Sequence, residues 1–381
     1  MQSKSILAKP PSTPPMDIVR KLSVFRFANP CIQGWIAIVL VAGTSLTAHT
    51  VGSDYEVKPI PLLDKSGVIV LDHLAYDRSK DRLWVPASNT GDVDVIDCGS
   101  DTVSHVSGFS TGEVDLEGRK ARLGPTAVSV GEGVVYIGNR GNSSLCVIDS
   151  QTLARGQCMP VPRASSESDT GPHQVAYVAA TREVWVTTGP GKSIQIFDVS
   201  EARHPKFKTK IDLDGETEGA ATDTKRGCFY TNISEKGATI AIDLKTRKVV
   251  SKWNAGSSEL QGLALDSQRC FLFVACTDRV VNLDTTHDGT LLDSIATGAG
   301  LDDIDFSPKQ KLLYAAASNT ATLSIIEVSD DGKFHLKALV PTAKGARGVA
   351  AGENSTAYLI DPGKGQILKL SYEPHDKLTN K

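Results

Sequence analysis

The sequence predicts an all-β protein, a seven-bladed β-propeller whose ring is closed by an N-terminal strand. Residues 261–294 contain four short apolar runs joined by polar turns, which is the strand number and length of one propeller blade. The same unit fits the chain six more times, with starts 41 to 53 residues apart. Because a lone four-stranded blade cannot bury both of its faces, seven copies predict a ring of stacked blades.

The first strand of each unit is expected to line the central channel. These strands are 72–76, 125–129, 173–177, 218–222, 261–265, 302–306 and 347–351. Their fourth residues are mostly small and apolar, as expected where strands crowd near the axis. The acidic exception is Asp305. A carboxylate there needs a hydrogen-bond donor or a neighbouring cation, and we expect backbone amides to supply the donors.

The two ends of the repeat region are expected to meet. The last unit has only three strands, near 347–351, 356–360 and 366–372, whereas residues 55–62 alternate like an extra strand. That segment should complete the last blade and leave no open sheet edge at the join. The domain is therefore predicted to span residues 49–374, followed by a polar tail at 375–381.

Residues 1–48 are separate from the repeats. Arg20, Lys21 and Arg26 precede the apolar run 35–42, and small residues follow at 46–48. This order is typical of a secretory signal peptide. An uncleaved membrane anchor is the alternative interpretation, although the apolar run is shorter than the roughly 20 residues of a comfortable membrane span. We expect a periplasmic or secreted protein without any other membrane segment.

Charge and cysteine content agree with export. Without the five basic residues and one acidic residue of the leader, 36 basic and 43 acidic residues remain, a formal charge of −7. Nucleic acid is not expected as a partner, because it requires a basic field. Cys146 and Cys158 each lie six residues from Thr152, the centre of a predicted hairpin turn. They should face each other, and we predict a disulfide, which suits an oxidising compartment.

The repeat also resembles a known family. Second strands carry Trp or Tyr at 82–85, 133–139 and 183–187, and third strands end in Val-Ile-Asp at 95–97 and 147–149. This pattern resembles the YVTN β-propeller repeat family, although no copy reads Tyr-Val-Thr-Asn itself. The resemblance implies an exported bacterial propeller. It implies no single activity, because the same architecture hosts lactonases, lyases and other hydrolases.

Polar side chains gather where the first strands begin, and all should converge on one mouth of the channel. The candidate binding residues are Asp72, His73, His173, Gln174, Glu218, Gln261, Asp302, Asp303 and Arg347. Two long connections, 107–124 and 162–172, should emerge on the same face, where binding surfaces are usually built.

Several functions are compatible with this set. The mouth could hold only water, or it could bind a small polar ligand, a metal ion or a protein partner without catalysis, in a protein that we expect to be monomeric. Asp302, Glu218 and His173 could hold a divalent cation such as calcium, manganese or zinc. The alternative is a metal-assisted lactonase-like hydrolase or lyase, with His73 or His173 as general base and Arg347 holding a carboxylate.

Overall fold

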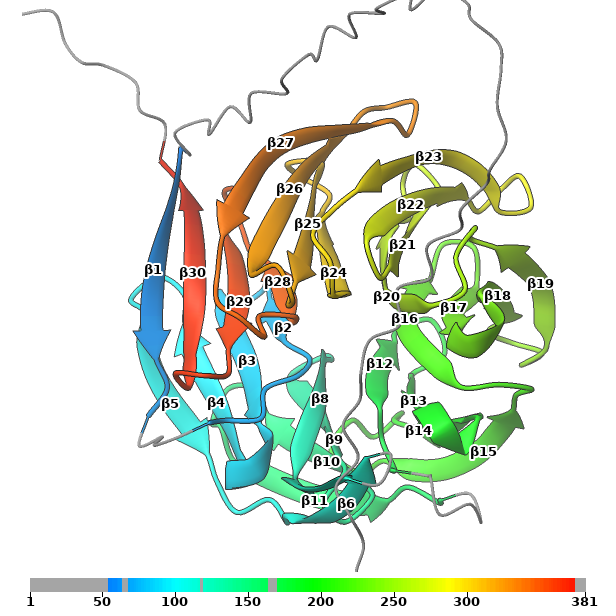
Figure 1. The fold of residues 1–381 in the computed structure, drawn as a ribbon. Helices are drawn as coiled ribbons and strands as arrows, with labels where there is room; N and C mark the ends of the chain where they lie inside the picture. Colours follow the sequence, from blue (N-terminus) through cyan, green and yellow to red (C-terminus); the bar gives the residue numbers. More distant parts are fainter. Residues whose placement is uncertain (1–53, 64–67, 117–118, 164–169, 374–381) are drawn as a thin grey trace, which may run out of the picture. The chain divides into compact units, whose positions relative to one another are not determined.

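The protein is a seven-bladed β-propeller in the computed structural model, which describes residues 54–63, 68–116, 119–163 and 170–373 (Figure 1). The predicted leader at 1–48 and tail at 375–381 lie outside the described residues. The strands are given from the axis outward. Blade 1 contains β2 (Ala75–Asp77), β3 (Arg82–Ala87), β4 (Asp92–Asp97) and β5 (Thr102–Val106), and blade 2 contains β8 (Pro125–Val130), β9 (Val134–Asn139), β10 (Ser144–Asp149) and β11 (Arg155–Pro160). Blade 3 contains β12 (Gln174–Val178), β13 (Glu183–Thr187), β14 (Ser193–Asp198) and β15 (Lys206–Asp212).

Blades 4 to 6 follow the same antiparallel order. Blade 4 contains β16 (Thr217–Asp223), β17 (Cys228–Ile233), β18 (Ala238–Asp243) and β19 (Val249–Asn254), and blade 5 contains β20 (Leu260–Asp266), β21 (Phe271–Cys276), β22 (Arg279–Asp284) and β23 (Thr290–Ala296). Blade 6 contains β24 (Leu301–Ser307), β25 (Leu312–Ala317), β26 (Thr322–Val328) and β27 (Phe334–Pro341). Short 3-10 helices, η1 (Ser88–Thr90), η2 (Gly189–Gly191) and η3 (Ser234–Lys236), join second to third strands in blades 1, 3 and 4.

The last blade confirms the predicted ring closure. It contains β28 (Val349–Ala351), β29 (Ala357–Asp361) and β30 (Gln366–Tyr372), and its outer strand is β1 (Tyr55–Pro61) from the other end of the chain. β1 pairs antiparallel with β30, from Tyr55 opposite Tyr372 to Pro61 opposite Gln366 (Figure 1). Because both chain ends share one sheet, the ring cannot open without breaking this strand pair.

The core lies between neighbouring blades. The second strand of each blade contains an aromatic residue that is at most 2% exposed; these residues are Trp84, Tyr136, Trp185, Tyr230, Phe273, Tyr314 and Tyr358. Alternation along a strand places every other side chain on one sheet face, so each of these rings packs in the layer between two blades. The periodic Trp and Tyr pattern in the sequence is therefore a packing pattern.

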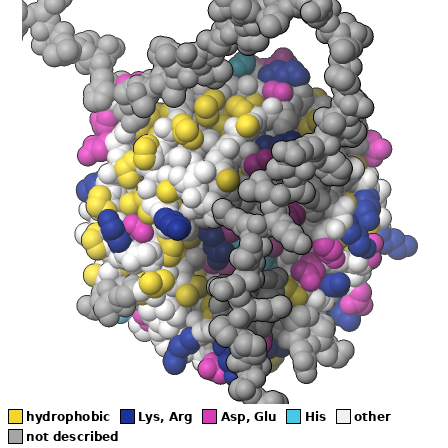
Figure 2. Space-filling model, viewed as in Figure 1, with side chains coloured by type: hydrophobic (Ala, Val, Ile, Leu, Met, Phe, Trp, Pro, Cys, Tyr) yellow, Lys and Arg dark blue, Asp and Glu magenta, His cyan; other side chains and the backbone are white. Residues whose placement is uncertain are grey.

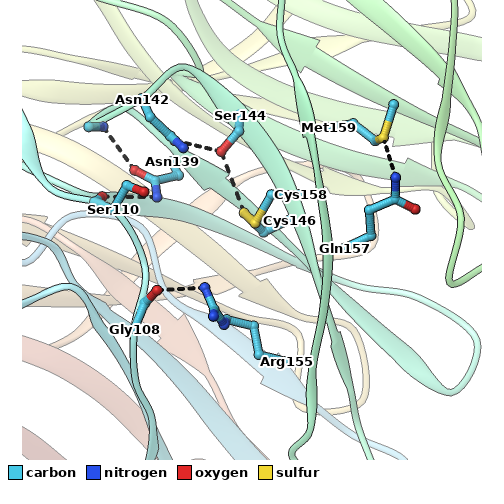
Figure 3. The surroundings of a disulfide bond; sticks show 11 residues. Gly108, Ser110, Asn139, Asn142, Ser144, Cys146, Arg155, Gln157, Cys158 and Met159 are labelled. Carbon is cyan, nitrogen blue, oxygen red and sulfur yellow. Dashed lines mark hydrogen bonds between the residues drawn. A yellow bond between two sulfur atoms is a disulfide. The ribbon is translucent and has the colours of Figure 1, made fainter.

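The disulfide prediction is confirmed. Cys146 on β10 lies directly opposite Cys158 on β11, and the two sulfur atoms are bonded (Figure 3). The other cysteines of the described residues are free: Cys98, Cys228, Cys270 and Cys276. The bond ties together the two outer strands of blade 2.

The long connection between blades 1 and 2 contains structure that was not predicted. Strands β6 (Gly112–Leu116) and β7 (Arg119–Leu123) form a separate two-stranded hairpin. Its sequence is rich in charged residues and lacks a strong apolar alternation, so it gave no strand signal.

On the face shown in Figure 2, acidic and basic side chains are interspersed. No helix in the described part of the chain is long and apolar enough to cross a membrane.

Candidate functional site

Most of the predicted residues surround one cavity at the mouth of the channel. Its volume is about 450 Å³. Seven of the nine predicted side chains line it: Asp72, His73, His173, Glu218, Gln261, Asp302 and Arg347. Gln174 and Asp303 instead line a second cavity of about 260 Å³ deeper in the channel. His73 borders both cavities. The ring therefore brings together residues that are up to 275 positions apart in the sequence.

Arg347 joins two of the carboxylates. Its Nη2 lies 2.9 Å from Asp72 Oδ1, and its Nη1 lies 3.4 Å from Asp302 Oδ2. Burial alone would raise the pKa of Asp72, but the Arg347 guanidinium, together with His73 and Arg140, outweighs burial and holds that pKa well below its ordinary value. Burial raises the pKa of Asp302 despite the same guanidinium. Asp72 is therefore the firmly ionised partner of Arg347.

The two histidines lie close together at the mouth. Their ring centroids are 5.9 Å apart in an edge-on arrangement. His73 Nδ1 is 3.9 Å from Asp303 Oδ2, whereas the buried His73 Nε2 has no hydrogen-bond partner. Burial lowers the pKa of His73, but Asp72 and Asp303 outweigh this and raise it to about 9. His73 is therefore a cation at neutral pH.

His173 forms a pair with Glu218. Its Nε2 is 3.5 Å from Glu218 Oε2, and its buried Nδ1 has no hydrogen-bond partner. Burial, together with the Arg140 guanidinium, lowers the pKa of His173 well below its ordinary value. Burial, together with the Asp302 carboxylate, raises the pKa of Glu218 to about 8. At neutral pH the pair therefore carries no net charge.

Arg140 is the site residue that the sequence analysis missed. It follows β9 and lies in the turn before β10, outside the aligned first strands, yet it lines the mouth cavity and is 7% exposed. Its Nε donates to Pro172 O at 3.0 Å. Thr277 and Ser318 also line the cavity from connections between second and third strands. A search that included those connections, which reach the same face, would have found all three.

Asp305 confirms the expectation of backbone donors. Its Oδ2 accepts from the Ala351 amide on β28, and its Oδ1 accepts from the Phe306 amide, both at 2.8 Å. Burial raises its pKa to about 6, although these hydrogen bonds act in the opposite direction. Asp305 therefore bridges blades 6 and 7 at the channel wall.

The predicted metal ligands are not drawn together as a ligand group. Among the described residues, no three His, Cys, Asp or Glu side chains are grouped so that they could hold a metal ion. Arg347 contacts Asp302, and the raised pKa of Glu218 keeps a proton on that carboxyl at neutral pH. Deprotonated carboxylates are what calcium and manganese require. A cation bound by Asp302, Glu218 and His173 would have to displace the Arg347 contact and the Glu218 proton, and this metal site stays a prediction.

Comparisons with known proteins show the fold alone. No family model and no curated protein sequence matches the chain. The streptogramin B lyase structure is similar to this chain with a TM-score of 0.64 and 12% identity, covering 83% of this chain and 97% of that one. The Cps50 (Swd1) β-propeller domain of Myceliophteria thermophila has a TM-score of 0.64 and 14% identity, covering 82% and 99%. The chain is a seven-bladed β-propeller. Membership of the YVTN family stays a prediction.

Proposed function

We propose that this protein is an exported propeller that binds a small polar ligand at the channel mouth and does not transform it. The observation that carries the proposal is the convergence of seven predicted side chains and Arg140 on one cavity of about 450 Å³. This volume lies in the usual range for small-molecule sites, in which a few placed polar groups set the orientation of the ligand. The leader pattern and the Cys146–Cys158 disulfide support export.

A ligand or a water molecule can use hydrogen-bonding atoms at the mouth that the protein leaves unpartnered. His73 Nε2, His173 Nδ1 and Arg140 Nη2 are buried and have no hydrogen-bond partner. Leaving such groups unpaired costs about 1 to 3 kcal/mol each. A polar ligand that reaches them would recover part of that cost. The structure therefore offers donors and acceptors that the protein itself does not use.

Titration calorimetry tests the proposal. Wild type and an Asp302→Ala/His173→Ala variant would be titrated with a panel of dicarboxylates, amino acids, sugars, calcium, manganese and zinc. We expect at least one compound to bind wild type and to bind the variant at least tenfold more weakly. Identical binding by both proteins would exclude the mouth as the site.

A protein partner at this face is compatible with the fold. β-Propellers commonly act as scaffolds for protein interactions, and the solved structures similar to this chain include one titled as the mitotic checkpoint complex, with a TM-score of 0.63 and 13% identity, covering 83% of this chain and 93% of that one. No described surface of this chain indicates which partner it would be. The cavity and its buried donors favour a small ligand instead.

Acid–base catalysis is the second candidate, and one observation favours it. The His173–Glu218 pair places a neutral imidazole beside a carboxyl with a raised pKa, which is typical of groups that exchange protons with a substrate. The similarity to a streptogramin lyase shows that this fold can carry lyase chemistry. Hydrolysis or elimination with a lactone panel, lost in Glu218→Gln, would support catalysis. An inert wild-type protein would argue against it.

A further inference from the structure

Arg140 is held in place from three directions. Its amide donates to Gly124 O at 2.9 Å, and its own carbonyl accepts from Arg163 Nη2 at 3.2 Å. Its side-chain Nε donates to Pro172 O at 3.0 Å. Gly124 belongs to the long connection between blades 1 and 2, and Arg163 and Pro172 belong to the one between blades 2 and 3. Both long connections therefore position this one residue.

The neighbouring glycine allows this arrangement. A Cβ on Gly141 would lie 2.5 Å from Ser110 O and 2.6 Å from Leu123 O, which is closer than real Cβ atoms approach. Gly112, at the base of the β6–β7 hairpin, is equally tight against the backbone of Gly141. Asn139 strengthens the same junction, since its Nδ2 donates to Ser110 O at 3.1 Å (Figure 3). The base of the hairpin is thus packed directly onto the turn that carries Arg140.

Arg140 forms no ion pair at the mouth, although the Asp72 and Glu218 carboxyl groups act on it electrostatically from farther away. Asp72 and Asp302 both pair with Arg347, Asp303 lies near His73, and Glu218 lies near His173. Within the described residues, no carboxylate lies within ion-pairing distance of Arg140. Its Nη2 is buried and has no hydrogen-bond partner. Each acidic group of the mouth therefore has a basic neighbour, and one guanidinium remains.

We infer that Arg140 is an anion subsite, and that the ligand of the mouth is a small molecule bearing a carboxylate or phosphate group. The inference rests on the proposed function and narrows it to a ligand class. A guanidinium presents its N–H groups in a planar fork that matches both oxyanions. Fixing Arg140 before the ligand arrives lowers the ordering cost of binding. His73, a cation bordering the same cavity, adds to the attraction for an anion.

The test compares four probes at constant ionic strength. Succinate and inorganic phosphate are the anions, succinamide is the neutral counterpart of succinate, and 1,4-diaminobutane is a cation of similar length. Each is titrated at up to tens of millimolar into wild type, Arg140→Gln, Arg140→Lys and Arg122→Gln. Arg122 is an exposed arginine of the β6–β7 hairpin, so its variant removes the same charge from the same face without touching the cavity.

We expect succinate or phosphate to bind wild type and Arg122→Gln equally, and Arg140→Gln at least tenfold more weakly. Tighter binding of succinate would identify a carboxylate ligand, and tighter binding of phosphate would identify a phosphate ligand. If Arg140→Gln fails to fold, Arg140→Lys, which keeps the charge but loses the fork, should still weaken succinate binding severalfold.

Three results would overturn the inference: unchanged anion affinity in both Arg140 variants, succinamide binding as tightly as succinate, or no anion binding at all. Binding of succinamide or 1,4-diaminobutane that is lost in Asp302→Ala/His173→Ala would overturn the anion subsite while leaving the mouth as a ligand site. If wild type binds none of the four probes and no compound of the wider panel, both the anion subsite and the proposed ligand site at the mouth are excluded.

Discussion

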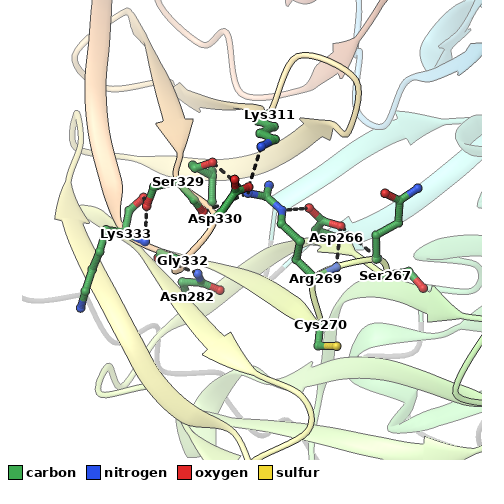
Figure 4. A network of polar contacts seen from close by, with 12 residues as sticks. Asp266, Ser267, Arg269, Cys270, Asn282, Lys311, Ser329, Asp330, Gly332 and Lys333 are labelled. Atoms are coloured by element: carbon green, nitrogen blue, oxygen red, sulfur yellow. Dashed lines mark hydrogen bonds and ion pairs between the residues drawn. The ribbon is translucent and has the colours of Figure 1, made fainter.

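The mouth of the ring and the turns at its opposite end contain the same residue types, but they pair them differently. At the opposite end, Arg269 Nε lies 2.6 Å from Asp266 Oδ2, and Arg269 Nη1 donates to Val328 O and Ser329 O (Figure 4). Arg226 pairs with Asp223 in the same way at 2.8 Å in blade 4. Each pair is formed within one turn, between residues three positions apart.

At the mouth, the partners come from different blades. Arg347 reaches Asp72 across the join of the ring, and no carboxylate of the described residues lies within ion-pairing distance of Arg140. Pairing within a turn is settled by local geometry, and it gives each of these arginines a carboxylate three positions away. Pairing across the axis depends on seven separate strands, and it leaves donors and acceptors over. This difference teaches that the lack of a paired carboxylate, and not polarity itself, separates a candidate site from a structural ion pair.

The largest expected effect is a difference in the free energy of unfolding between substitutions at the two ends of the ring. Asp266→Ala should lower the free energy of unfolding by about 4 kcal/mol, because it leaves the Arg269 guanidinium with only the exposed Asp330 carboxylate at 3.5 Å and frees the amides of Gln268 and Arg269. Asp302→Ala at the mouth should cost less than about 1 kcal/mol, because Asp302 is partly exposed and Arg347 keeps Asp72. Urea unfolding followed by tryptophan fluorescence measures both. Equal losses would contradict the comparison.

A second prediction uses the pH dependence of stability. The folded-state pKa of Asp305 is about 6, above its ordinary value, so between about pH 4 and pH 6 the folded protein holds a proton that the unfolded chain releases. Asp305 therefore contributes less stability as the pH rises through this window. The amide side chain of the Asp305→Asn variant cannot titrate. The free energy of unfolding of this variant, relative to that of wild type, should therefore increase by on the order of 2 to 3 kcal/mol between about pH 4 and pH 7.5.

Unfolding curves at several pH values check this second prediction. Asp212→Asn is the matched control, because it removes the same charge from an exposed position. A difference between Asp305→Asn and wild type that stays constant with pH would show that the buried carboxylate is not the titrating group.

The smallest expected effect concerns the backbone beneath Arg140. Gly141→Ala should cost about 2 kcal/mol, because its Cβ would press against the carbonyl oxygens of Ser110 and Leu123. Gly99→Ala, in a turn at the opposite end, is the control, since its Cβ would meet nothing closer than 3.7 Å. Thermal unfolding distinguishes the two variants. A neutral Gly141→Ala would mean that the hairpin base does not constrain the turn of Arg140.

Much of the fold was predictable because the repeat encodes it directly. Short apolar runs joined by polar turns, such as β20 and β21, identify a blade, and the missing fourth strand of the last unit identifies β1 as its partner. The Cys146–Cys158 bond followed from equal spacing about a turn. In each case the interacting residues are local or belong to a repeated pattern.

The site was predictable only where it uses that pattern. Asp72, His173 and Glu218 occupy equivalent positions at the start of the repeat in blades 1, 3 and 4, so aligning the repeats brought them together. Arg140 lies in a connection between strands, where residue type follows no repeat and the backbone path is set by packing against another loop. The β6–β7 hairpin was missed for the same reason.

The amino-acid sequence by itself determined the number of blades, the closure of the ring and which side chains begin the inner strands, because these depend on patterns of residues within a blade. The tertiary structure alone decided which acid pairs with which base, which protons are held and which guanidinium stays unpaired. Those properties depend on distances and burial across the central axis, where residues from different blades share one low-dielectric space.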